Sequence, residues 1–584
     1  MGLPKFETQG SLFESLGSIA PQLFDNHDRY KLFALKIWPL LSGCREELAQ
    51  CYDQGNGRPG VEPVVLLGVS IFQFLERIPD RQAVEMVKYH LGWKLALNLS
   101  LNDRGFHATT LVNFRQRLLE NDKAHVAFQT VLEALQKEGL IPKRAKQRLD
   151  STHVLSAVRD MSALECVRET LRLGLEALEK ELDAGERPEF WTQLWERYVE
   201  NKLDFRSAPE VLRSKQRQSG IDAKRLLEWV EPMRGEVRYA PAVELLRVVF
   251  EQQYEVVQGE IQRVKIHATG VVCNPHDVDA QWSAKREKRW VGYKVQVAET
   301  IAEAPARSEE PVGRFITSVV TQKATESDDA GLELTLEAQK AAGLEKPAEL
   351  YVDGAYVSGV HLKSAIEQNY ELVGPAQPSA GRANIPEAYR IEAFTIDIAG
   401  RQAICPGGFK NTQCSRLEES ANHRVKYRFE WSTHCHGCAL ITQCVGSEQR
   451  HRTIVVGENH DLLQARRIDQ KSEGFKERMH QRNGIEGTIS ELTRAHGMRR
   501  TRYRGLAKAR FQNLFIATAC NIKRWLKLEG AKTDESASYF PAEALNKAFD
   551  RTLSAIPGVN KLLERICRVN NRLYVCYLDR FAIC

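Results

Sequence analysis

Hydrophobic residues recur at helical spacing through the first quarter of the chain. Val64, Leu67, Ile71 and Leu75 follow one another at intervals of three or four positions. Such spacing places apolar side chains on one face of a helix. Similar patterns continue to about residue 140, so residues 1–140 are predicted to form an N-terminal helical module. The pattern does not decide whether this module is structural, binds DNA or mediates dimerisation.

Shorter runs rich in β-branched and alternating apolar residues predict strands from residue 146 onward. These runs cover residues 146–156, 292–298, 314–320, 349–352 and 370–373, and a helix is expected over 330–342. Residues 161–260 interrupt them with a leucine stripe at helical spacing, formed by Leu171, Leu175, Leu178 and Leu182. This order favours the α/β class, with a mixed β-sheet flanked by helices and carrying a helical insertion.

Two aspartates lie in or directly after predicted strands, at positions where a carboxylate can have a functional role. Asp353 follows the alternating Leu350 and Val352 and precedes Gly354, at the carboxyl end of its strand. Ligands often bind at that end of a strand in α/β sheets, although Asp before Gly is also common in ordinary turns. Asp150 falls within a strand, where burial disfavours a carboxylate unless it is paired or binds a cation.

The positive charge of the chain is concentrated in one block. The net charge is +6, yet residues 463–527 contain 16 Lys and Arg against 5 Asp and Glu. A block of this length favours a polyanion such as nucleic acid, although short runs of this kind are often solvated faces. The expected phosphate contacts are Arg499, Arg500, Arg502, Arg504, Lys508 and Arg510, with a second cluster at Lys285, Arg286, Lys288 and Arg289.

Cysteines gather in residues 401–465, the second interruption of the strand pattern. Cys435 and Cys438 form a C-x-x-C pair, which suits tetrahedral zinc, and Cys405 and Cys444 complete a set of four thiolates. The alternative ligands are Cys414, His434 and His436, and the alternative interpretation is a group of unrelated free thiols. The pattern therefore predicts a Cys-rich insertion braced by a structural zinc ion.

A third carboxylate, Glu486, lies on a predicted helix within the basic block. Arg482 precedes it by four residues, so the two side chains can share a helix face. An exposed pair of this kind contributes only a few tenths of a kcal/mol, so the pair alone indicates no chemistry. Gly484 and Gly487 weaken a helix, which favours a close approach of another part of the chain there.

These motifs, taken in order, resemble those of bacterial insertion-sequence transposases with an RNase H-like DDE catalytic domain. The resemblance runs from about residue 62 to residue 525 and is carried by the stretches 149–152, 279–294, 353–356, 482–486 and 502–505. It implies that Asp150 and Asp353 on neighbouring strands, with Glu486 on a packed helix, bind Mg²⁺ or Mn²⁺. It also implies that Arg482 holds Glu486 or a DNA phosphate.

The resemblance implies hydrolysis at transposon ends and attack of the freed 3′-hydroxyl on target DNA. The implied partners are double-stranded DNA, as terminal inverted repeats and target, and a second copy of the chain in a homodimer. The alternatives are a metal nuclease that does not join strands and a catalytically inactive, transposase-derived DNA-binding protein. Met479 and Thr493 occupy positions where related transposases often carry Tyr and Lys, so part of the phosphate-contacting signature is absent.

A chain of 584 residues is too long for one hydrophobic core. No membrane span or signal peptide is visible, which favours a cytoplasmic protein that joins the nucleoid when bound to DNA. The expected divisions are the N-terminal module at 1–140, the first catalytic strand at 141–160, the helical insertion at 161–260, the RNase H-like core at 261–400, the Cys-rich insertion at 401–465, the catalytic Glu helix and basic segment at 466–530, and a tail at 531–584.

Overall fold

The computed structural model describes most of the chain. The described residues are 23–53, 59–202, 206–233, 240–264, 270–285, 288–302, 313–378, 385–419, 424–445 and 449–538. Arg286 of the expected DNA-binding set and most of the tail at 531–584 lie outside these ranges. Within them, none of the helices combines the length and apolarity that a membrane crossing requires.

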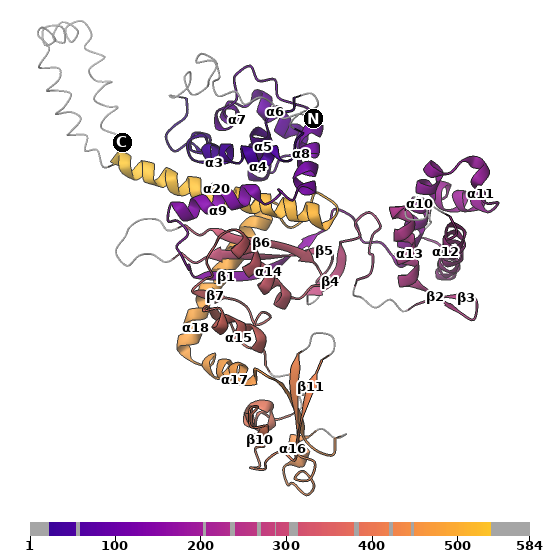
Figure 1. Ribbon diagram of the computed structural model, residues 1–584, viewed down its shortest axis with the longest axis vertical. Helices are drawn as coiled ribbons and strands as arrows, with labels where there is room; N and C mark the ends of the chain where they lie inside the picture. Colours follow the sequence, from indigo (N-terminus) through magenta and orange to yellow (C-terminus); the bar gives the residue numbers. More distant parts are fainter. Residues whose placement is uncertain are drawn as a thin grey trace, which may run out of the picture.

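A six-stranded mixed sheet lies at the centre of the molecule (Figure 1). Its main path is β4-β5-β1-β7-β8, and β6 also pairs with the long β5. β5 runs antiparallel to β1, β4 and β6, whereas β7 runs parallel to both β1 and β8. The strands are β1 (Gln147–Leu155), β4 (Gln281–Lys285), β5 (Lys288–Thr300), β6 (Ile316–Lys323), β7 (Glu349–Tyr351) and β8 (Glu371–Val373).

All five predicted strands lie in this sheet, so the prediction of a mixed sheet flanked by helices is confirmed. The predicted helix at 330–342 is α14 (Asp328–Ala341), and α15 (Gly359–Glu367) connects β7 to β8. The sheet also contains β4, which the sequence pattern did not predict. Successive side chains of β5 point to opposite faces of the sheet. Val297 packs into the core shared with the N-terminal helices, and Ala298 packs into the core beneath α14.

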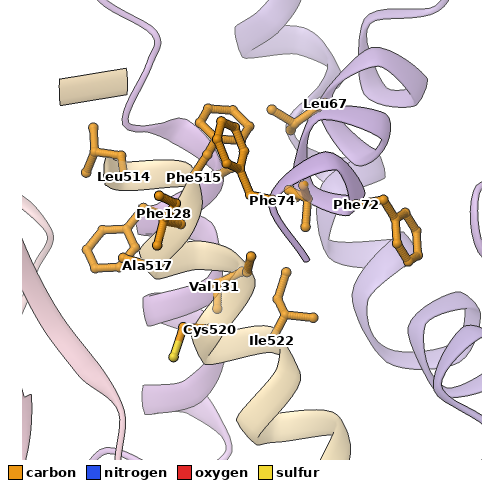
Figure 2. Close-up of a cluster of buried hydrophobic side chains, with 14 of the residues drawn as sticks. Leu67, Phe72, Phe74, Phe128, Val131, Leu514, Phe515, Ala517, Cys520 and Ile522 are labelled. Atoms are coloured by element: carbon orange, nitrogen blue, oxygen red, sulfur yellow. The ribbon is translucent and has the colours of Figure 1, made fainter. Parts of the chain in front are cut away.

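The N-terminal helices and the last helix share one core with the sheet. The N-terminal helices are α2 (Arg29–Leu32), α3 (Trp38–Gly43), α4 (Arg45–Ala49), α5 (Pro63–Glu76), α6 (Asp80–Tyr89), α7 (Leu91–Ala96), α8 (Thr109–Glu120) and α9 (Val126–Lys137). The last helix, α20 (Leu506–Ser538), passes between them and β6. Figure 2 shows Phe515 and Ile522 of α20 close to Phe74 of α5 and Val131 of α9.

One face of α20 lies in this core, because Phe511, Leu514, Phe515, Ala519 and Ile522 are all buried. α5 is apolar around most of its circumference and is correspondingly buried along nearly its whole length. The N-terminal helices are therefore packed onto the central sheet through α20.

Residues 161–263 form a body that projects from one end of the sheet (Figure 1). It contains α10 (Ala163–Glu181), α11 (Trp191–Trp195), α12 (Pro209–Val230), α13 (Pro241–Gln253), β2 (Tyr254–Val257) and β3 (Glu260–Arg263). Leu171, Leu175 and Leu178 of the predicted stripe are fully buried in its own core. The insertion is thus helical as predicted, and it ends in a hairpin that the pattern did not reveal.

The Cys-rich segment lies at the opposite end from the N-terminal helices (Figure 1). It contains the hairpin β9 (Thr395–Asp397) and β10 (Gln402–Ile404), the sheet β11 (Gln413–Glu418), β12 (Val425–Glu430) and β13 (Thr453–Gly457), and α16 (Ile441–Cys444). Trp431 and Phe429 are the large buried side chains of its small core. Then α17 (His460–Asp469), α18 (Glu473–Met479) and α19 (Gly484–Ser490) return the chain to the central sheet.

Candidate active site

Strand register brings Asp150 and Asp353 to the same level of the sheet. β1 and β7 are parallel, and Arg148 pairs with Tyr351. Each aspartate lies two residues beyond that pair, so both carboxylates stand at the end where β7 finishes. Asp353 follows the last paired residue of β7 and accepts a hydrogen bond from the backbone N–H of Ala355 at 2.8 Å. The predicted position of Asp353 at the carboxyl end of its strand is confirmed.

One guanidinium group links the two carboxylates. Nη2 of Arg482 lies 2.7 Å from Oδ2 of Asp150 and 3.9 Å from Oδ2 of Asp353. Arg482 belongs to a 3-10 turn, His480–Asn483, that precedes α19. Its Nε is buried and has no hydrogen-bond partner among the described residues. The sequence motif is therefore brought to the strands from a segment more than three hundred positions away.

Asp150 is held in an environment that opposes its negative charge. Burial raises its pKa, the Arg482 guanidinium counteracts part of that effect, and the charge of Asp353 raises the pKa further. The backbone N–H of Ser151 donates to Oδ1 at 2.7 Å and favours the ionised form. The net direction is a pKa above the usual range of aspartate. A divalent cation would relieve this penalty, because it would neutralise both carboxylates at once.

Glu486 reaches this region but does not join the cluster. It lies in the first turn of α19, which packs against β1, and its side chain is exposed. Neither Asp150 nor Arg482 forms a hydrogen bond or ion pair with Glu486 among the described residues. Arg482 lies in a 3-10 turn and Glu486 in the α-helix that follows it, and no ion pair joins the two side chains. Arg482 pairs with Asp150 instead.

A buried charge network fixes the segment that carries Arg482 and Glu486. Glu299 is fully buried at the end of β5 and binds Arg148 at 2.5 Å, Thr488 at 2.5 Å and Arg524 at 3.1 Å. Arg148 also donates to the backbone carbonyl of Gln481 at 2.9 Å. The network therefore connects β1 and β5 with α19 and α20.

Sequence reasoning missed Glu299, although a signal for it exists. An acidic residue that ends a long buried strand breaks the same local rule as Asp150. The close approach expected at the two glycines is seen at Gly484, where a Cβ atom would overlap the guanidinium of Arg148. Gly487 has open space around it.

The basic side chains expected to meet DNA divide into two groups. Arg499, Arg500 and Arg502 donate to the backbone carbonyls of His153, Ser156 and Ile78. The exposed side chains without a hydrogen bond or ion pair in the described part of the chain are Arg504, Lys508, Arg510, Lys285, Lys288 and Arg289. The first group therefore helps to hold the basic segment against the end of β1 and the turn that follows α5. The second group is free to bind an anion.

Four cysteines line one small cavity in the Cys-rich segment. Cys405, Cys435, Cys438 and Cys444 surround a space of about 20 Å³, together with His434. Burial raises the pKa of Cys444, Arg452 lowers it, and the other three sulfurs raise it again. The backbone N–H of Arg452 donates to Sγ of Cys435 at 3.4 Å. Of the alternative ligands, only His434 is among the residues that line this cavity.

Another group of potential ligands lies in the interior. Glu491, His496 and Cys520 have ligand atoms within 4.8 Å of one another, a spacing that the four thiols of the cavity do not meet. Glu491, however, already binds Lys523 at 3.0 Å and Arg524 at 2.9 Å. Burial by itself raises the pKa of Glu491, but these two cations outweigh it and bring the pKa to about 2. Protein cations thus neutralise this carboxylate, and the group fits an ion network better than a metal site.

Comparison with known protein families gives two matches. Residues 21–117 match the model of a transposase domain (DUF772), which covers most of the N-terminal helices. Residues 404–526 match the model of the transposase DDE domain, which covers the Cys-rich segment, Arg482, Glu486 and most of α20. Searches of curated proteins and of solved structures returned no match. These two matches support an insertion-sequence DDE transposase.

Proposed function

We propose that the protein cleaves transposon ends and joins them to target DNA by divalent-metal-dependent phosphoryl transfer. The main support for this proposal is that the guanidinium group of Arg482 lies within ion-pair distance of both Asp150 and Asp353. Two carboxylates that share one guanidinium group repel each other unless cations neutralise them. In a chain with a DDE transposase domain, such a pair is the expected core of a metal site.

The sheet supports an RNase H-like catalytic core. Three successive antiparallel strands, β1, β5 and β6, are followed by β7 and β8 on the other side of β1 and parallel to it. This places the first strand at the centre, with Asp150 on it and Asp353 at the end of its neighbour. We infer that the helical insertion enters this core after β1 and that the Cys-rich insertion enters after β8.

Asp150 and Asp353 would hold Mg²⁺ or Mn²⁺, which prefer oxygen ligands, and Glu486 on the neighbouring α19 would be the third carboxylate once an ion is bound. Bound there, the ions would lower the pKa of an attacking water or 3′-hydroxyl and stabilise the leaving oxygen. The chain itself contributes orientation. The Glu299 network holds α19 against β1, and Arg482 has a buried, unpaired Nε that can donate to a phosphate oxygen.

The DNA substrate is expected to follow the exposed basic side chains. Arg504, Lys508 and Arg510 at the start of α20 would neutralise phosphates, as would Lys285, Lys288 and Arg289 of the β4–β5 hairpin. We propose a homodimer as the active species, because two transposon ends have to be processed together. The molar mass measured by light scattering with and without DNA ends tests this assembly.

Cleavage and joining are tested with duplex DNA taken from the flanks of the gene that encodes the chain, together with Mg²⁺ and a supercoiled target plasmid. The wild-type protein is expected to nick the duplex and to produce joined products. Asp150→Asn, Asp353→Asn and Glu486→Gln are expected to lose both reactions while retaining DNA binding. Joining that persists in Glu486→Gln would show that another residue is the third carboxylate.

The same assay separates the competing functions. Cleavage without joined product would identify a metal nuclease. DNA binding without either reaction, unaffected by Asp150→Asn, would identify an inactive DNA-binding protein. The proposed function requires both products and their loss when Asp150 is changed.

We further propose that Cys405, Cys435, Cys438 and Cys444 bind a structural zinc ion. The four cysteines line the same cavity of about 20 Å³, and zinc would draw the thiols closer together. Elemental analysis is expected to find one zinc per chain, which Cys438→Ser abolishes and Cys414→Ser does not. A zinc-free protein with unchanged folding in the presence of a chelator would refute this site.

A further inference from the structure

A second cavity opens beside Asp150 and is not part of the carboxylate cluster. Its volume is 310 Å³. β1 contributes residues 151–153, which follow Asp150 directly, and the β4–β5 hairpin contributes Lys285 and Trp290. Arg499, from the segment before α20, forms another part of the wall. The cavity thus lies next to the carboxylates on the same strand.

The charged groups around this cavity leave a positive excess. Asp328 is the one acidic residue that lines the cavity, and it forms an ion pair with Lys294 at 3.2 Å. Arg499 donates only to uncharged oxygens, the hydroxyl of Thr152 at 3.2 Å and a backbone carbonyl at 2.8 Å. Lys285 is exposed, with no hydrogen bond or ion pair to any described residue. Two cations are therefore left without a carboxylate partner inside the cavity.

The lowered pKa of His153 agrees with an excess of positive charge around the cavity. Burial lowers the pKa of its imidazole, and Arg499, Lys288 and Lys285 lower it further, to about 4. His153 is consequently neutral at physiological pH. It packs against the Trp290 ring with centroids 5.0 Å apart, so it shapes the wall of the cavity while the surrounding cations supply the charge.

Trp290 adds an unused hydrogen-bond donor. The residue is only 8% exposed, and its Nε1 is buried without a hydrogen-bond partner in the described part of the chain. A buried N–H without an acceptor is unfavourable, and a bound anion would provide the acceptor. A polar donor, two cations without a carboxylate partner and a cavity of this size together suit a phosphate group.

We propose that this cavity binds one phosphodiester group of the DNA strand next to the scissile phosphate. Lys285 and Arg499 provide the charge, and Nε1 of Trp290 donates a hydrogen bond to a phosphate oxygen. This subsite rests on the proposed function, because its position beside Asp150 makes it a positioning site for the reacting strand. It would hold the scissile bond in register with the carboxylates.

The test uses duplexes in which one phosphate at a time, around the mapped cleavage position, is replaced by a neutral methylphosphonate. Dissociation constants are measured without divalent metal, so that no cleavage occurs. For the wild-type protein, one flanking position is expected to weaken binding by roughly 10-fold. The same replacement is expected to have no effect in Lys285→Gln and a reduced effect in Trp290→Phe, which keeps the ring and removes the donor.

Lys288→Gln is the matched control, since Lys288 lies on the same hairpin but does not line the cavity. It is expected to bind all duplexes more weakly while keeping the position-specific loss. Thermal unfolding of each variant checks that the fold is retained. The subsite is overturned if no position shows a specific loss, or if the loss persists in full in both Lys285→Gln and Trp290→Phe. A wild-type protein that binds or cleaves no duplex would instead overturn the proposed function and, with it, the subsite.

Discussion

At the scale of single residues, Asp150 combines two opposing requirements. Its carboxylate has to be ionised to bind a metal, yet burial and Asp353 raise its pKa, while Arg482, a backbone N–H and the charge of Lys285 favour the ionised form. A group with a raised pKa in the folded state stabilises the fold at low pH, and this contribution is lost as pH rises through the folded-state pKa. The environment of Asp150 therefore reduces the stability of the metal-free protein at neutral pH.

Asp150→Asn is accordingly expected to raise the midpoint of thermal unfolding of the metal-free protein at pH 7, while abolishing cleavage. The gain should disappear below the ordinary pKa of aspartate, where both the folded and the unfolded wild-type chains carry a protonated side chain. Calorimetry in chelator across this pH range measures the effect. A midpoint that falls at pH 7 would show that the ion pair with Arg482 outweighs burial.

Arg482→Gln is expected to move the acidic limb of the pH–rate profile for DNA cleavage to higher pH. The reason is that Arg482 lowers the pKa of Asp150, and its removal leaves burial and Asp353 less opposed. Arg478→Gln is the matched control, because Arg478 pairs with Glu349 and Glu371 and not with Asp150. The acidic limb of the pH–rate profile should not move in Arg478→Gln. An unshifted limb in Arg482→Gln would contradict this role.

At the scale of elements, α19 depends on the network around Glu299 for its position. Arg148 and Arg524 share this buried carboxylate, and Thr488 donates to it from α19. Removing one partner from a buried ion pair leaves uncompensated charge, which typically costs about 3–5 kcal/mol. The placement of Arg482 and Glu486 thus relies on an element contact that lies outside the active site.

Glu299→Gln is expected to lower the free energy of unfolding by roughly 3–5 kcal/mol and to speed amide hydrogen exchange in 484–490. Glu371→Gln, which removes an exposed partner of Arg478, should change stability by no more than about 1 kcal/mol. Hydrogen exchange followed by mass spectrometry measures both variants. Equal protection of 484–490 in Glu299→Gln and the wild type would show that α19 is held by other contacts.

At the scale of the whole molecule, α20 joins the N-terminal helices to the central sheet. It packs on α5 and α9 on one side and on β6 on the other, and these contacts form one continuous hydrophobic core. The helical insertion has separate cores of its own. The molecule is thus expected to unfold in at least two cooperative units, one built around α20 and one formed by the insertion.

Phe515→Ala tests this division, because truncating a buried Phe typically costs about 3–5 kcal/mol. It is expected to reduce hydrogen-exchange protection of α5, α9 and β6 together and to leave α10, α12 and α13 unchanged. Leu175→Ala is the counterpart and should affect only the insertion. Loss of protection in both units from either change would indicate a single cooperative unit.

The sequence alone determined the local features of this protein. Strand and helix patterns located β1, β5, β6, α14 and β8, because side-chain periodicity is a property of neighbouring positions. The basic block and the C-x-x-C pair are visible for the same reason, as is the odd placement of Asp150 within a strand. The family resemblance rested on such short motifs, and the matched transposase domains agree with it.

Only the tertiary structure decided which of these residues meet. The register of β1 and β7 places Asp150 level with Asp353, and a 3-10 turn delivers Arg482 to Asp150 rather than to Glu486. The division of the basic block into bonded and free side chains has the same origin. These outcomes depend on contacts between segments that lie hundreds of residues apart, and such contacts leave no periodic trace in the sequence.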